Sequence, residues 1–401
     1  MTFRNALHNI STRKLLFYVF IVLLGAWACY MLSTQLLPEL SARFVFDPAD
    51  HRVYFTRGAW MVENTIALSE YPQVSNLLFG LNRLLVLGFR PDIQLLIFIS
   101  FMSLEMTLVL FFTIKILIQM LPDRDRWLSL LMFLPTTLWF VFNRFDILPA
   151  FLCLLALYYL YKNHPTIAAV ILAVATFTKW YPVLLLPAFL LFEFTRNRKF
   201  PWKSIIAFTL ASLVILLPTY LRGGMDALLI PYQFHAQRGL EYFSLPALIG
   251  KAFIAVIPEF NLQMLVPIFL AFQLFMPFLS PFLRFDELES VLDYSILGIA
   301  AFILFGRVSS PQWLIWLMPF LILAVKDKKD IWLIVFYNLV TYLAFPLAFD
   351  LFGDASIEFG VFTAFIYVAL FLIIFRTIKR IHFSLDFFQM LRPQKKAELP
   401  S

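Results

Sequence analysis

Long apolar runs separated by short polar segments dominate the chain. A helix needs roughly 20 apolar residues to cross the hydrocarbon core, and it can be shorter where protein surrounds it. The runs continue without the alternation of a β-barrel strand. The pattern therefore predicts an all-α polytopic membrane protein, a single transmembrane domain over residues 1–401 with about 12 transmembrane helices (range 10–13). The runs cover residues 15–37, 93–121, 127–142, 147–161, 166–178, 181–195, 204–221, 263–283, 291–306, 311–325, 331–349 and 357–375.

Two further apolar stretches, residues 74–89 and 245–257, are interrupted by polar residues. We expect both to form helices that lie along the outer face of the membrane or dip into it. The first run, 15–37, is too long for the apolar region of a signal peptide and lacks a convincing small-residue cleavage site. We therefore expect it to remain as an uncleaved first span.

Composition supports the membrane class. Hydrophobic residues make up 61% of the chain and charged residues 14%, whereas soluble domains average about 45–50% and 25%. A soluble globular enzyme and a disordered chain are both excluded. The two cysteines, Cys29 and Cys153, lie in apolar runs, so we expect neither a disulfide nor a zinc site.

Charge sets the expected orientation. The formal net charge is +7, which we attribute to basic cytoplasmic loops rather than to a nucleic-acid partner. Residues 196–203 are the most basic short loop, and residues 350–358 contain no Lys or Arg. This predicts cytoplasmic termini, including a tail over 377–401, provided that 74–89 does not cross. The extracytoplasmic side then carries a first loop over 38–92 with juxtamembrane helices, and a second long loop over 222–260.

The first of these loops carries the candidate base. Asp47 and Asp50 are three residues apart and would share a face of a helix. Asp47 stands before Pro48, which is typical of a helix N-cap followed by Pro at the first helical position. We expect Asp50 to be functional and Asp47 to be the cap, and we expect His51 to be a surface histidine.

Four other polar segments fall on the same predicted face. Residues 143–146 could be a plain turn with an Arg–Asp pair or part of a site, since polar residues at a membrane boundary are costly. Lys179 could equally extend from a helix end to water. Arg238 could grip a phosphate, whereas Ser310 and Pro311 look like an ordinary helix start. The segments are 143–146, 178–182, 234–244 and 307–313.

In this order, the segments resemble integral-membrane glycosyltransferases of the C-type fold (GT-C), and more narrowly the bacterial polyprenyl-phosphate-mannose-dependent mannosyltransferases. The family usually has Glu-Tyr-Pro-Pro where this chain has Glu70-Tyr-Pro-Gln73. The resemblance spans residues 47 to 320. Its motifs are Asp50-x-x-x-Tyr54, Glu70-Tyr71-Pro72, Asn143-Arg144-Phe145-Asp146, Thr178-Lys179-Trp180-Tyr181-Pro182, His235-x-x-Arg238-Gly239-x-Glu241-x-x-Ser244 and Ser310-Pro311-Gln312.

The resemblance implies transfer of a sugar, mannose by analogy, from a polyprenyl-phosphate donor to a lipid or glycan acceptor on the extracytoplasmic face. A phosphate leaving group needs charge stabilisation rather than a strong acid, so one carboxylate suffices as base. We expect Asp50 to be this base in an inverting single displacement. The expected donor-phosphate residues are Arg238, Lys179, Arg144 and Arg222. Substrate-binding or supporting roles are expected for Tyr54, Glu70, Tyr71, Asp146, Tyr181, His235, Glu241 and Gln312.

The expected partners are the lipid-linked donor, the acceptor and membrane lipids, with no nucleic acid. We expect no cofactor and no metal, although a divalent ion is conceivable because two acids share the first loop. The chain has no glycine fingerprint of a nucleotide-binding domain, which favours a lipid-linked donor. The alternative from another class is a multi-pass transporter or lipid flippase; a catalytically inactive scaffold is the third.

Overall fold

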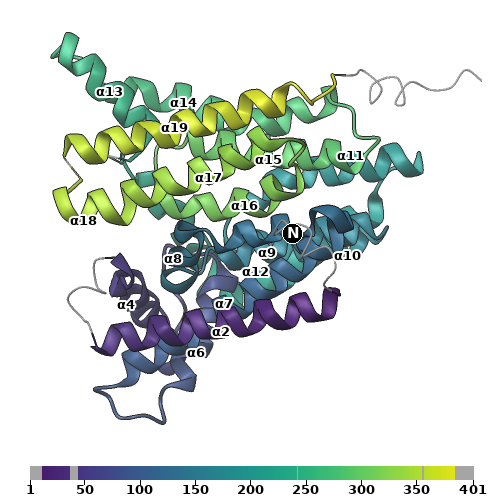
Figure 1. Cartoon of the computed structure of the whole chain (residues 1–401). Helices are drawn as coiled ribbons and strands as arrows, with labels where there is room; N and C mark the ends of the chain where they lie inside the picture. Colours follow the sequence, from purple (N-terminus) through teal and green to yellow (C-terminus); the bar gives the residue numbers. More distant parts are fainter. Residues whose placement is uncertain (1–10, 37–43, 242, 355, 384–401) are drawn as a thin grey trace, which may run out of the picture.

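The computed structural model describes residues 11–36, 44–241, 243–354 and 356–383. This part of the chain is a bundle of helices without a β-strand, apart from one isolated bridge between Leu283 and Phe383 (Figure 1). The predicted all-α class is confirmed. The α-helices are α2 (Thr12–Leu36), α4 (Pro48–Arg57), α5 (Ala59–Val62), α6 (Gln73–Leu85), α7 (Gln94–Met120), α8 (Pro135–Asn143), α9 (Ile147–Tyr161), α10 (Pro165–Thr178), α11 (Leu186–Asn197), α12 (Trp202–Gln237), α13 (Leu245–Val256), α14 (Leu265–Leu279), α15 (Leu288–Leu304), α16 (Leu314–Leu323), α17 (Lys328–Tyr342), α18 (Phe349–Phe352) and α19 (Ile357–Ile378).

Shorter helical turns join several of these helices. Most are 3₁₀ turns, and one π-helical segment carries α17 into α18. The turns are η1 (Asp123–Phe133), η2 (Tyr181–Leu185), η3 (Leu262–Met264), η4 (Ser280–Phe282), η5 (Pro311–Trp313) and η6 (Leu343–Ala348).

Six helical segments among the described residues are long and apolar enough to cross a membrane. A seventh is counted if α8 and α9, which meet at 109°, form one broken span. The expected number of about 12 is not confirmed. The reason lies in breaks within the apolar runs: run 127–142, for example, divides into η1 and α8 at Leu134–Pro135. The six segments are Thr12–Thr34, Gln94–Met120, Trp202–Gln237, Leu265–Phe282, Lys328–Phe352 and Ile357–Ile378.

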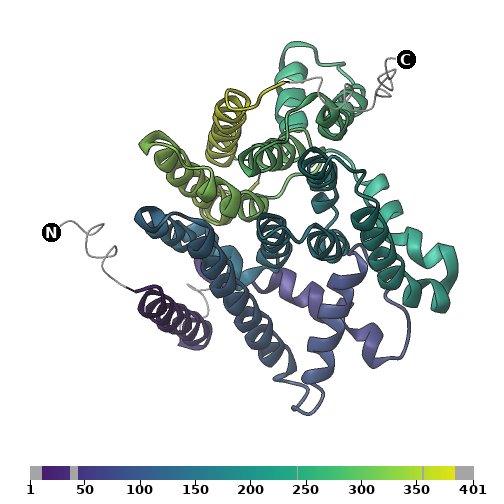
Figure 2. The same ribbon diagram turned by 90° about the vertical axis from the view of Figure 1, so that its right-hand side faces the viewer.

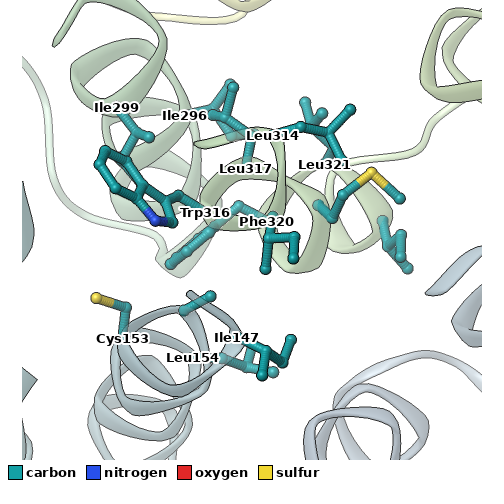
Figure 3. Packing of buried hydrophobic residues seen from close by; sticks show 14 of the residues in the cluster. Ile147, Cys153, Leu154, Ile296, Ile299, Leu314, Trp316, Leu317, Phe320 and Leu321 are labelled. Carbon is teal, nitrogen blue, oxygen red and sulfur yellow. The ribbon is translucent and has the colours of Figure 1, made fainter. Parts of the chain in front are cut away.

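The short apolar helices lie inside the bundle. The 14 residues of α10 would rise only about 21 Å, less than the hydrocarbon thickness. They pack against α9 and α12. Helix α16 packs against both α15 and α9. Figure 3 shows Leu314 and Leu317 on the side of α16 toward Ile296, and Phe320 on the side toward Ile147 and Leu154. This packing positions the residues at the ends of α9 and α16, where the polar groups of the site lie.

The long helices lie with their axes in similar directions, so the polar segments that join them gather at the two ends of the bundle. In Figure 1, α4, α6 and α18 lie at the left end, whereas the first turn of α2, the last turn of α19 and the end of α11 lie at the right. Figure 2 views the bundle nearly end-on, with α2 at its edge beside α7. We call the left end, with α4, α5, α6 and α18, the first-loop end.

The second long loop is more helical than expected. The run 204–221 is part of α12, which continues to Gln237, with a kink where Gly224 adopts φ 64° and ψ −159°. A positive φ with extended ψ is a conformation that glycine adopts readily. The continuation carries His235 to the first-loop end.

Helix α6 has an inverted distribution of polar and apolar residues. Ser75, Asn76 and Asn82 are buried against the protein, whereas Leu77 and Leu81 are 46% and 49% exposed. A water-soluble helix would bury the leucines instead. This inversion, together with a length of 13 residues, fits the expected helix that lies in the outer face of the membrane with its leucines toward lipid.

Candidate active site

Helix α4 carries the candidate base in its first turn. Asp47 is the N-cap, and its side chain accepts a hydrogen bond from the Ala49 backbone N–H at 3.0 Å. Pro48 occupies the first helical position, so the predicted cap is confirmed. Tyr54 lies one turn after Asp50 and donates its hydroxyl to Asp50 Oδ2 at 3.2 Å.

Arg144 lies at the break between α8 and α9 and joins three distant segments. Its Nη2 lies 2.5 Å from Asp47 Oδ2, and its Nε lies 2.7 Å from Asp50 Oδ2. Nε also donates to Gln312 Oε1 at 3.1 Å. The guanidinium is buried, with 6% of the side chain exposed. The motifs of the first loop, residues 143–146 and residues 310–312 therefore meet at one side chain.

Asn143 fixes the segment that precedes α4. Its amide nitrogen donates to the carbonyls of Val45 and Trp139 at 2.9 and 2.8 Å. Its Oδ1 accepts from the Asp47 backbone N–H at 2.8 Å and from the Tyr30 hydroxyl at 3.2 Å. The hydrogen bonds of this fully buried amide fix the position of the first loop on the bundle. Sequence reasoning gave Asn143 no separate role, although it belongs to the 143–146 motif.

His51 is not a surface residue, so that prediction was wrong. Its side chain is 2% exposed, and Nε2 lies 3.0 Å from the Phe142 carbonyl oxygen. Burial lowers the pKa of His51 to about 4. The error arises because α4 packs on the end of α8. The face of α4 that carries His51 is therefore covered by the bundle.

An aromatic wall stands beside Asp50. Tyr54 stacks on Phe79 with centroids 4.6 Å apart, and Tyr71 and Phe145 meet this pair edge-on. Burial, with the charge of Asp50 as the next cause, raises the pKa of Tyr54 and of Tyr71 well above the ordinary value. Tyr54 therefore stays protonated and acts as a donor to the Asp50 carboxylate.

Asp146 and Lys179 form a buried ion pair behind this wall. Lys179 Nζ lies 2.6 Å from Asp146 Oδ1, which also accepts from Trp316 Nε1 at 2.8 Å. Asp146 is fully buried, and Tyr181 stacks on Trp316 with centroids 4.1 Å apart. Lys179 thus points to a carboxylate rather than to water. Trp316 was missed in the sequence because it lies within an apolar run.

The second half of the site joins the first loop to the end of α12. Glu70 pairs with Arg57 at 2.9 Å, and the Glu70 carbonyl lies 3.2 Å from His235 Nε2. Arg238 forms an ion pair with Glu241. Among the expected site residues, Glu70, His235, Arg238 and Glu241 are therefore gathered here.

Arg307 is a further residue that sequence reasoning did not select. Its Nη2 donates to the carbonyls of His235 and Ala236, at the C-terminal end of α12. Its own carbonyl accepts from the Glu241 backbone N–H at 3.0 Å. The guanidinium thus ties the end of α12 to residues 306–313. The sequence did not indicate this role, because residues 307–313 look like an ordinary helix start.

An apolar groove of about 380 Å³ lies between α6 and α12. Gln73 and Pro231 line it, three residues after Glu70 and four before His235. Arg222 also lines the groove and donates to the Thr65 carbonyl at 3.4 Å, so it lies apart from the other expected phosphate residues. The remaining lining is mostly apolar, including Ile66, Val74, Leu77, Val214, Ile215, Pro218 and Ala227.

Metal ligands are not gathered in the described part of the chain: no group of three or more His, Cys, Asp and Glu there could hold an ion. Asp47 and Asp50 both face Arg144 instead. The expectation of a metal-free site stays a prediction.

The apolar helices and the comparison with known families fit an integral-membrane glycosyltransferase of the GT-C type. The match is to glycosyltransferase family 87, and it covers residues 71–243. It includes Arg144, Lys179 and His235, whereas Asp50 precedes it and Gln312 follows it. No curated protein matches the chain significantly.

Proposed function

We propose that the protein transfers a sugar from a polyprenyl-phosphate donor to a hydroxyl of a lipid or glycan acceptor, with Asp50 as the base. The observation that carries this proposal is the position of Asp50. Its side chain is 32% exposed, and its only partners in the described structure, Arg144 and Tyr54, approach Oδ2. Oδ1 is thus available to an incoming hydroxyl.

The reaction proceeds as one displacement with inversion at the anomeric carbon. The acceptor oxygen forms the new bond to this carbon as the bond to the phosphate oxygen breaks. The acceptor proton passes to Asp50 Oδ1, and the phosphate leaves with the bonding electrons. A phosphate leaving group needs stabilisation of its charge rather than a proton, so one carboxylate suffices. This differs from a glycosidase, which uses a pair of carboxylates.

The donor head is proposed to lie between Glu70 and the end of α12. The proposed ligands of the head on this side are His235, Arg238 and Lys179, and Arg222 lines the groove. The apolar groove suits an isoprenoid chain, because its lining is mostly aliphatic. Gln73 and Pro231 in its lining are near Glu70 and His235 in the chain, which supports a ligand with an anionic head and an apolar tail.

The sugar, mannose, is proposed from the resemblance of the motifs, as is the extracytoplasmic position of the site. The basic loop at 196–203 and the first-loop end lie at opposite ends of the bundle (Figure 1). This supports cytoplasmic termini and an outer site, since basic loops favour the cytoplasm.

The donor class can be tested with purified protein in lipid nanodiscs. Radiolabelled polyprenyl phosphomannose and a radiolabelled nucleotide-linked mannose are supplied in parallel with a crude glycolipid extract. We expect label from the lipid-linked donor alone to enter a new product. Transfer from the nucleotide-linked sugar, with none from the lipid-linked one, would refute the proposed donor.

A further inference from the structure

Arg144 is poorly placed to receive a substrate phosphate. Its side chain is 6% exposed, and its nitrogens already contact Asp47, Asp50, Gln312 and the Asn143 carbonyl, the last at 2.9 Å. A phosphate would have to displace two carboxylates from a buried guanidinium. Charged hydrogen bonds of this kind are short and strong, so the resident carboxylates are strong competitors.

The residues that contact Arg144 are themselves held in place by the fold. Asn143 holds residues 45–47 through two of its bonds, and Asp47 is fixed as the cap of α4. Gln312 comes from the 3₁₀ turn that begins α16. A planar guanidinium has donors in a fixed fork, which a flexible ammonium cannot reproduce. Arg144 is thus suited to setting the orientation of the side chains that it contacts.

Asp50 has a hydrogen bond and an ion pair on the same oxygen. Arg144 and Tyr54 both approach Oδ2, whereas no protein donor in the described ranges reaches Oδ1. Because both contacts fix the same oxygen, they define the direction of the other. The titratable and charged groups that face Asp50 are Arg144, Asp47, His51, Tyr54 and Tyr71.

We propose that Arg144 is a positioning residue for the base rather than a ligand of the donor phosphate. It holds Asp50 by Oδ2 and leaves Oδ1 to take the acceptor proton. This inference rests on the proposed function and replaces the expectation that Arg144 binds the phosphate.

The test compares Arg144→Gln and Arg144→Lys with Arg238→Gln in the transfer assay. Both Arg144 variants should lower kcat by at least about 10-fold while the donor KM stays within about 2-fold, because a misplaced base slows the chemical step alone. Arg238→Gln should instead raise the donor KM. Arg144→Lys keeps a buried positive charge, so it preserves the fold if Arg144→Gln does not.

The split between kcat and the donor KM separates positioning from a purely structural role: a folded variant that loses kcat with an unchanged donor KM has a misplaced base. A raised donor KM with an unchanged kcat in Arg144→Lys would overturn the inference and return Arg144 to the phosphate. Wild-type protein without turnover would instead count against the proposed function.

Discussion

Gly58 offers a direct test of how the fold places the base. It lies between α4 and α5, where a Cβ would be 2.4 Å from the Phe79 carbonyl oxygen and 2.9 Å from Arg83 Cβ. Ordinary contacts begin near 3.4–3.5 Å, so Gly58→Ala must separate α4 from α6 by about 1 Å. Overpacking of this kind costs about 1–3 kcal/mol.

The same displacement reaches the site, because Tyr54 on α4 stacks on Phe79 of α6 and holds Asp50. A shift of about 1 Å in a reacting group can cost about 100-fold in rate. We therefore expect Gly58→Ala to lose at least about 10-fold in kcat and to melt several degrees lower in detergent. Gly88→Ala is the matched control, since a Cβ there meets no atom within 4 Å. Wild-type kcat and melting temperature in Gly58→Ala would refute the reasoning.

Three further predictions concern the buried polar groups. The free energy of unfolding should fall by up to about 3 kcal/mol as the pH drops from about 6.5 to about 4, because His51 is protonated at higher pH in the unfolded state than in the folded state. The melting temperature of His51→Phe should lose most of this pH dependence, and an unchanged dependence on pH would contradict the prediction. Asn143→Leu should melt at least several degrees lower, because it leaves buried partners such as the Asp47 N–H unpaired, and unchanged melting would count against this role of Asn143. Asp146→Leu should destabilise the protein by about 3–5 kcal/mol, because Lys179 keeps a buried unpaired charge. The double variant with Lys179→Met should recover stability, and equal melting temperatures of the single and double variants would contradict this coupling.

The local signals in the sequence predicted several parts of the site. Asp47 before Pro48 predicted the cap, because capping depends on neighbouring residues alone. Apolar run length predicted the all-α membrane class for the same local reason. The polar interruptions of 74–89 predicted a helix along the membrane surface; α6 forms within this stretch and exposes Leu77 and Leu81, and its place in the membrane stays a prediction.

Other features depend on contacts between distant segments. His51 is buried because α4 rests on the end of α8, 91 residues away. Arg144 meets two carboxylates instead of an open phosphate site because α8 and α9 bend by 109° where it stands. Trp316 and Arg307 reach the site only through the packing of α16 and α12. No periodicity or spacing in the sequence encodes these contacts.

The number of spans shows the same limit. A run of apolar residues does not reveal whether its helix is broken, and the break at Lys179, for instance, separates two helices shorter than a membrane. Tertiary packing supplies the partners that let such helices end early.

The central claim is that Asp50 takes the acceptor proton. Wild type, Asp50→Asn and the remote control Asp92→Asn, whose carboxylate pairs with the exposed Arg90, would be compared in nanodiscs for donor binding and for transfer of label from polyprenyl phosphomannose. We expect all three to bind the donor and Asp50→Asn to lose at least about 100-fold in transfer. Near wild-type transfer by folded Asp50→Asn would contradict the claim.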